Sequence, residues 1–271
     1  MTLVSTDWLG KNLSKVKIID ASWHLVKNRN GIEEYNKEHI ENAIFFDLDK
    51  NSDQRKDLPH GHFLPSAKDH EKNISEMGIL NTDRIIIYCY SDLISSCRAW
   101  FQFLYFGHDP KLVSVLNGGM KKWKLEGRKV TNLKTKISPS KYKAKENKNM
   151  IKIKTQIDEN IKRKEFTILD ARSKNRFLGL APEPRPGIKS GSIEGSKSMP
   201  LSEIVNLKDN TFLDTKKLRD IFNSCEINSS KIVMSCGSSV SAASLALAYS
   251  LINDDYMPKI YIGSWTEFGK K

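Results

Sequence analysis

The strongest constraint on the fold of this chain is an internal duplication. Four segments of the first half return in the same order in the second half: VKIIDASW matches FTILDARS, KEHIENAIFFDL matches SGSIEGSKSMPL, DRIIIYCYSD matches SKIVMSCGSS, and VSVLNGGMKKW matches PKIYIGSWTEF. The offset is nearly constant, at 150, 147 and 145 positions, measured at the pairs Asp20/Asp170, Cys89/Cys236 and Gly118/Gly263. Repeated order and offset predict two copies of one fold.

Each copy alternates short apolar runs with helix-like segments. The third and fourth segments of each half are separated by such a segment, SSCRAWFQFLYFGH in the first half and VSAASLALAYSLIN in the second. This alternation favours an α/β class with a mostly parallel sheet flanked by helices in each half. We expect one domain over residues 1–130, a Lys- and Asn-rich linker over 131–150, and a second domain over 151–271.

The composition limits the classes of binding partner that we expect. Of the 271 residues, 39% are hydrophobic and 28% charged, as in a globular protein without a membrane span. The net charge of +12 comes from scattered lysines, so we expect a solvated surface that gathers small anions rather than a nucleic-acid interface. The start of the chain lacks the pattern of a signal peptide, which predicts a cytoplasmic location.

Four cysteines are present, and Cys236 is the candidate for chemistry. The spacings of Cys89, Cys97, Cys225 and Cys236 match no zinc motif, so we expect free thiols and no metal. Cys236 ends an apolar strand, before the small residues Gly237, Ser238, Ser239, Val240 and Ser241 and a helix. Backbone N–H groups of such a turn and the positive end of a helix dipole both favour a thiolate, which is the nucleophilic form.

The other cysteines are interpreted as packing residues. Cys89 ends the equivalent strand of the first half, but its loop carries the bulky Tyr90 and the acidic Asp92 and no glycine. A nearby carboxylate opposes formation of a thiolate. Small apolar packing is also the common role of Cys97 and Cys225.

The motifs together resemble the two-domain sulfurtransferases of the rhodanese superfamily. The resemblance rests on VSTDWL, IIDASW, FFDLD, HFLPS, LNGGMKKW, LDARSKNRF, PEPRPGI, SCGSSVSAA and GSWTEFG, which follow the family's order over nearly the whole chain. It implies two tandem rhodanese-like domains, the first non-catalytic and the second catalytic. The uncharged loop CGSSVS is more similar to the 3-mercaptopyruvate branch than to the thiosulfate branch, whose loop is basic.

The resemblance also implies a reaction. A cysteine takes sulfane sulfur from 3-mercaptopyruvate, releases pyruvate and holds the sulfur as a persulfide. A thiol acceptor such as thioredoxin, or cyanide, then removes it. No metal or organic cofactor is implied, and neither a nucleic acid nor a membrane is an expected partner.

Roles carry over to matching positions. Cys236 matches the nucleophile, and Arg176 and Arg185 match the arginines that hold the carboxylate and carbonyl of the substrate. A guanidinium fork suits a planar carboxylate better than an ammonium does. Ser238 matches a proton-passing hydroxyl with His62 and Asp49 as its partners in a relay, and Gly237, Ser239, Val240 and Ser241 form the loop around the substrate.

At two places the sequence departs from the family pattern, and each departure affects a predicted site residue. The family has glycine where this chain has Ser239, which is costly if the position needs a positive φ. LPHGHFLP contains two histidines where the family has one, so His60 competes with the preferred His62. A thiosulfate sulfurtransferase and a non-catalytic persulfide carrier or binding module stay open as alternatives to the 3-mercaptopyruvate enzyme.

Overall fold

The computed structural model describes residues 2–26, 28–225 and 231–271, which form two compact units. The first unit contains the described residues of Met1–Asp53, Leu64–Asn147 and Asn206–Phe212. The second contains Gln54–Phe63, Lys148–Val205 and the described residues of Leu213–Lys271. The segment Gln54–Phe63, which carries both histidines of LPHGHFLP, therefore packs with the second half of the chain.

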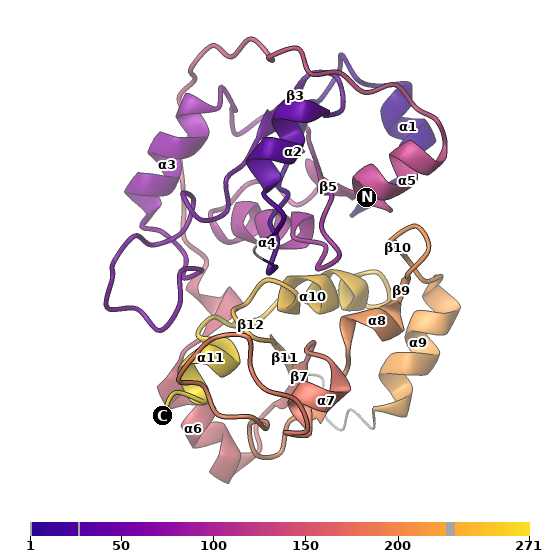
Figure 1. Cartoon of the computed structure of the whole chain (residues 1–271). Coiled ribbons are helices and arrows are strands. Elements are labelled where there is room, and N and C mark those ends of the chain that lie inside the picture. Colours follow the sequence, from indigo (N-terminus) through magenta and orange to yellow (C-terminus); the bar gives the residue numbers. More distant parts are fainter. Residues whose placement is uncertain (1, 27, 226–230) are drawn as a thin grey trace. The chain divides into compact units, whose positions relative to one another are not determined.

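The first unit is a five-stranded parallel sheet with helices (Figure 1). Its strands, in sheet order, are β1 (Leu3–Val4), β5 (Val113–Leu116), β4 (Ile85–Tyr88), β2 (Lys17–Asp20) and β3 (Ala43–Phe45). Its helices are α1 (Thr6–Gly10), α2 (Gly31–Lys37), α3 (Ala67–Glu76), α4 (Ser96–Tyr105) and α5 (Gly119–Leu125). A short pair of strands, β9 (Val205–Asn206) and β10 (Thr211–Phe212), forms a separate two-stranded sheet.

The second unit repeats this topology, as the duplication predicts. Its parallel strands, in sheet order, are β6 (Ile151–Lys152), β12 (Ile260–Tyr261), β11 (Ile232–Ser235), β7 (Thr167–Asp170) and β8 (Lys197–Ser198). Its helices are the 3-10 turn η1 (Lys148–Met150), α6 (Lys154–Arg163), α7 (Lys174–Phe177), α8 (Leu201–Ile204), α9 (Thr215–Ser224), α10 (Ala242–Ser250) and α11 (Ser264–Phe268). The predicted α/β class with two parallel sheets is confirmed.

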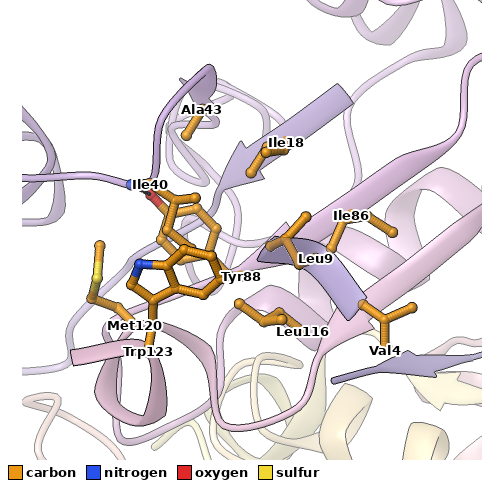
Figure 2. Packing of buried hydrophobic residues seen from close by; sticks show 10 residues of the cluster. All are labelled: Val4, Leu9, Ile18, Ile40, Ala43, Ile86, Tyr88, Leu116, Met120 and Trp123. Atoms are coloured by element: carbon orange, nitrogen blue, oxygen red, sulfur yellow. Dashed lines mark hydrogen bonds between the residues drawn. The ribbon is translucent and has the colours of Figure 1, made fainter. Parts of the chain in front are cut away.

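The central strands are buried along their whole length because helices cover both faces of a parallel sheet. All four residues of β4, β5 and β11 are buried. In the first unit these strands contribute Ile86, Tyr88 and Leu116 to a core that Leu9 and Trp123 of the flanking helices complete (Figure 2). The two polar side-chain groups in this cluster are satisfied, because the Ile40 N–H donates to the Tyr88 hydroxyl at 3.1 Å and the Trp123 indole donates to the Lys129 carbonyl at 2.9 Å.

The turns HIEN and SIEG, which precede β3 and β8, show how the two copies keep one backbone shape with different residues. Asn42 in the first turn has φ 64°, and Gly195 in the second has φ 74°. Both residue types tolerate the left-handed region better than others do. The same turn therefore feeds the outer strand of each sheet.

The strand register places the loop after β7 beside the loop after β11. Asp170 at the end of β7 is the register partner of Ser235 at the end of β11. Parallel strands end at one edge of the sheet, which is where ligands bind in folds of this kind. The residues after Asp170, including Arg172 and Arg176, therefore emerge next to Cys236.

Candidate active site

Cys236 begins a tight loop between β11 and α10 and is almost fully buried. The first turn of helix α11 braces this loop from its backbone side. Trp265 N–H donates to the Cys236 carbonyl at 2.9 Å and Thr266 N–H donates to the Gly237 carbonyl at 3.0 Å. These bonds fix the start of the loop before any substrate is present.

Ser264 is the centre of this bracing, and inspection of the sequence did not single it out. Its Oγ accepts from the N–H groups of Cys236 at 3.4 Å and of Ser239 at 3.1 Å, and donates to the Tyr261 carbonyl at 2.9 Å. Two loop N–H groups thus point at Ser264. The nest expected around the sulfur can draw only on the remaining N–H groups of the loop.

Ser239 adopts the conformation that the family glycine would favour. Its φ is +60°, in the left-handed region, and its side chain is fully buried. The Ser239 Oγ donates to the carbonyl of His62 at 3.4 Å. The cradle is therefore formed with a non-glycine residue, at a conformational cost that the bonds of Ser239 to its neighbours offset.

The two predicted arginines converge on the residue that follows Cys236. A methyl group placed on Gly237 would lie 3.1 Å from Nη2 of Arg176 and 3.7 Å from Nη1 of Arg185. Arg185 also donates from Nη2 to the Ser238 Oγ at 3.0 Å. The structure thus brings Arg176, Arg185 and the loop together, and an added side chain at Gly237 would crowd the guanidinium of Arg176.

Arg176 is held by a buried chain of charges that the sequence did not reveal. Glu183 binds Arg176 on one side and Arg172 on the other, with Nη–O distances of 2.5 and 2.8 Å. Arg172 continues the chain to Asp170 at 2.7 Å and is only 1% exposed. Burial opposes the charge on Arg172, but its bonds to Asp170 and Glu183 outweigh this, so the pKa of Arg172 is raised.

A comparison of the two copies could have found this chain of charges. FTILDARS has Arg172 where VKIIDASW has Ser22. In the first unit Ser22 donates to the Asp20 carboxylate from its N–H at 2.9 Å and from its hydroxyl at 2.5 Å. Without a cation there, burial raises the pKa of Asp20 to about 6. The exchange of serine for arginine marks which copy carries the buried charges.

Ser238 lies between a histidine and an arginine. Nδ1 of His62 is 2.9 Å from the Ser238 Oγ. Because Arg185 can only donate, its bond occupies one lone pair of Ser238 and leaves the hydroxyl hydrogen to point at an unprotonated Nδ1. The same contact runs in reverse when Nδ1 carries the proton, so the pair can move a proton in either direction.

The structure separates the two histidines of LPHGHFLP. His62 contacts Ser238 through its ring, whereas Nε2 of His60 contacts the carbonyls of Ile262 at 3.2 Å and Gly263 at 3.1 Å. Burial, with the charges of His62 and Arg185, lowers the pKa of His60 to about 3. His62 is the histidine at the loop.

The remaining predicted site residues are Val240 and Ser241 of the loop and Asp49 of the first unit. Val240 is buried, and Ser241 begins helix α10 with φ −71°. Asp49 belongs to the first unit, where its carboxylate accepts from the Trp23 indole at 3.1 and 3.2 Å. The part of Asp49 in a relay stays a prediction from the sequence.

All four cysteines, each within the described residues, are free. Cys89 is buried with its sulfur 3.4 Å from the Ser96 Oγ, and burial raises the pKa of its thiol. Burial and the nearby Glu203 likewise raise the pKa of Cys225. Thiols of this kind are poor nucleophiles at neutral pH.

Neither a membrane-spanning helix nor a metal-binding cluster is present among residues 2–26, 28–225 and 231–271. No helix in that part of the chain is long and apolar enough to cross a bilayer. No group of three or more His, Cys, Asp or Glu side chains there could hold a metal ion.

Comparison with known proteins identifies the family of this chain. The model of the rhodanese-like domain family matches residues 5–126 and 154–271. The chain belongs to the rhodanese family. It is 36% identical to the mitochondrial thiosulfate/3-mercaptopyruvate sulfurtransferase 1 of Arabidopsis thaliana over 98% of this chain and 75% of that protein.

Two further relatives place the chain within this family. It is 33% identical to human 3-mercaptopyruvate sulfurtransferase, over 98% of this chain and 91% of that protein. The crystal structure of SseA from Escherichia coli, a 3-mercaptopyruvate sulfotransferase, matches with a TM-score of 0.86 at 29% identity, covering 98% of this chain and 99% of that one. The chain is a sulfurtransferase, as its motifs predict.

Proposed function

We propose that this sulfurtransferase moves sulfane sulfur from 3-mercaptopyruvate through a persulfide on Cys236. The observation that carries the proposal is the convergence of Arg176 and Arg185 at Gly237, one residue from the cysteine. A 2-oxo carboxylate presents a carboxylate and a carbonyl oxygen, which two guanidinium groups can bind together. The loop residues 237–241 carry no charge of their own.

The proposed chemistry has two transfers. The thiolate of Cys236 attacks the sulfur of 3-mercaptopyruvate and forms an S–S bond. The C–S bond breaks and its electron pair stays on the carbon, which gives the enolate of pyruvate. The enolate then takes up one proton. An acceptor thiolate then attacks the outer sulfur, and Cys236 leaves as a thiolate again.

Ser238 and His62 have the proposed task of moving protons. A Ser238 hydroxyl that passes its hydrogen to or from His62 Nδ1 can supply the proton that the enolate needs. Arg185, bonded to the same hydroxyl, stabilises negative charge on that oxygen. Arg176, Arg185, Ser238 and His62 thus act on the donor, while Cys236 carries the sulfur.

Thiosulfate is the second candidate donor. Arg185 lies on the loop through its bond to Ser238, which supplies the positive charge that a thiosulfate dianion requires. Steady-state kinetics with both compounds decide which of them is the donor. A kcat/KM for thiosulfate above that for 3-mercaptopyruvate would overturn our assignment of the donor.

A non-catalytic persulfide carrier is the candidate from another class. Intact-mass spectrometry after incubation with 3-mercaptopyruvate should find one added sulfur atom on wild type and on Cys225→Ser, and none on Cys236→Ser. Loading without turnover in the presence of thiol would favour the carrier. A Cys236→Ser variant that still transfers sulfur would remove Cys236 from the reaction.

The acceptor and the roles of the two halves complete the proposal. A reduced dithiol protein such as thioredoxin can take the sulfur and release it as sulfide while forming its own disulfide, and cyanide takes it as thiocyanate. We infer that residues 1–130 form a non-catalytic domain apart from the segment Gln54–Phe63, which brings His62 to the second unit, that residues 131–150 are a linker and that residues 151–271 are catalytic. The first copy lacks a reactive cysteine of its own, because burial raises the pKa of Cys89 at the equivalent strand end. Product analysis with thioredoxin, with cyanide and with neither tests the acceptor.

We also infer a cytoplasmic location. Four free cysteines suit a reducing compartment. The plant relative described above is mitochondrial, so the alternative is a mitochondrial matrix, which is also reducing. Fractionation of cells that express the chain with a C-terminal tag distinguishes the two.

A further inference from the structure

His60 has both ring nitrogens in hydrogen bonds, and together they define its tautomer. The backbone N–H of His62 lies 3.0 Å from Nδ1 of His60. A backbone N–H can only donate, so Nδ1 accepts and carries no hydrogen. The hydrogen is therefore on Nε2, which faces two carbonyl oxygens, of Ile262 and Gly263, that can only accept.

The surroundings of His60 keep the ring neutral. The residue is 7% exposed and stacks on Phe63, with ring centroids 4.6 Å apart. The titratable groups that face it are His62 and Arg185, and both disfavour a second positive charge, as does burial. A neutral ring with one donor and one acceptor matches its three backbone partners without a leftover group.

The turn that His60 binds leads directly into the start of α11, which braces the Cys236 loop. Ile262 and Gly263 directly precede Ser264, whose Oγ accepts from the Cys236 and Ser239 N–H groups. His60 thus joins the backbone of His62 to the support behind Cys236. The side chain of His62 then reaches Ser238, two residues after Cys236.

We propose that His60 is a positioning residue that ties the segment bearing His62 to the Ile262–Gly263 turn and thereby sets the contact between His62 Nδ1 and the Ser238 hydroxyl. It touches neither the substrate nor the reacting atoms. Its effect on turnover rests on the proposed function, but its tautomer and its hold on His62 do not. A shift of about 1 Å in a proton-transfer contact is enough to lower a rate by about 100-fold.

Three variants test the contacts of the two ring nitrogens of His60 separately. His60→Leu removes both contacts. His60→Asn keeps an acceptor near the Nδ1 position, for the N–H of His62, and His60→Gln keeps a donor near the Nε2 position, for the two carbonyls. The control is His70→Phe, at a buried histidine of the first unit.

The first readout is nuclear magnetic resonance of 15N-labelled histidine rings. We expect His60 to show the Nε2–H tautomer and no titration down to about pH 4. In His60→Leu the Nδ1 signal of His62 should move as its bond to Ser238 is lost, and in His70→Phe it should stay. A His60 that titrates near its ordinary pKa, or a His62 signal that does not move in His60→Leu, overturns the proposal.

The second readout is turnover of 3-mercaptopyruvate. We expect kcat of His60→Leu to fall about 30-fold with KM within about threefold, and His60→Asn and His60→Gln to recover part of the loss. Equal loss in all three variants, or none, contradicts a positioning role. If His60→Leu does not fold, the Asn and Gln variants still decide. If wild type fails to load sulfur, the proposed function fails while the ring signals still test His60.

Discussion

The carboxylate of Glu183 accepts two hydrogen bonds from the guanidinium of Arg176, with Nη2–Oε2 at 2.5 Å and Nε–Oε1 at 3.2 Å. The same carboxylate binds Arg172 at 2.8 Å and is only 2% exposed. One buried acid thus holds two arginines. Because a guanidinium is planar, bonds at Nε and Nη2 fix the direction in which Arg176 points.

Glu183→Gln should therefore damage both stability and the site. A neutral amide leaves the buried guanidinium of Arg172 and the partly buried one of Arg176 with one carboxylate fewer, which costs about 3 kcal/mol of unfolding free energy. We expect KM for 3-mercaptopyruvate to rise about tenfold because Arg176 loses its fixed direction. Urea unfolding and steady-state kinetics measure the two effects. The exposed Glu194→Gln, the control, should change neither, and an unchanged KM in Glu183→Gln would show that Arg176 is held by other contacts.

Gly237→Ala tests the convergence of the arginines. The added methyl group would stand 3.1 Å from Nη2 of Arg176, closer than most carbon contacts allow. We expect the guanidinium heads to be displaced, so that kcat/KM for the donor falls about tenfold while the unfolding free energy changes by less than about 1 kcal/mol. Gly61→Ala is the matched control, because an added methyl group there meets no described atom within 4 Å. A Gly237→Ala enzyme with normal kcat/KM would argue against binding of the donor at this point.

Substitutions at Ser239 test its left-handed backbone. Ser239→Gly removes the steric cost of φ +60° but adds freedom to the unfolded chain, so stability should stay within about 1 kcal/mol of wild type, with activity retained. Ser239→Val places a branched side chain in the same conformation and should lose about 2 kcal/mol. Thermal unfolding measures both variants.

Ser241 supplies the control for backbone conformation, because its φ is −71° in the same loop. Ser241→Val should cost less stability than Ser239→Val. Equal losses at the two positions would indicate that lost space, rather than backbone conformation, determines the cost.

His70→Phe should change how stability depends on pH. Burial and the charges of His108 and Arg98 lower the pKa of His70 to about 3, so between about pH 6.5 and pH 3 the unfolded chain binds a proton that the folded protein does not. Stability from this residue is present above pH 6.5 and is lost as the pH falls. The phenylalanine variant should gain about 2 kcal/mol over wild type on going from about pH 7 to about pH 5.

Urea unfolding at both pH values measures this gain as a difference between two proteins. Asp20, His60 and His108 are shared by both, so their own titrations cancel. The ring of His70 stacks on Phe106 at 4.0 Å, and Gln102, its neighbour, keeps a bond to the Asn51 carbonyl at 2.8 Å. A parallel pH profile for the two proteins would mean that His70 has the same pKa in the folded protein as in the unfolded chain.

The sequence alone was sufficient for the architecture, and it supplied Cys236 as the proposed nucleophile. Two copies of the same strand and turn segments predict two parallel sheets, because buried β-branched runs and glycine turns act locally and repeat with the chain. Cys236 was identified by its place between a buried strand and a small-residue loop. The arginines Arg176 and Arg185 followed from the family motifs, and the structure brings both to Gly237.

Tertiary structure alone decided how that site is held. Arg172, Glu183 and Arg176 lie in a row only because β7 and the loop after it fold back, and the choice between His60 and His62 depended on bonds to residues about 200 positions away. Ser264 lies within the motif GSWTEFG, but nothing in that motif indicates that it binds the N–H groups of Cys236 and Ser239. A local pattern records which side chains are present. The strength of a buried charge or hydrogen bond depends on partners that only folding brings within reach.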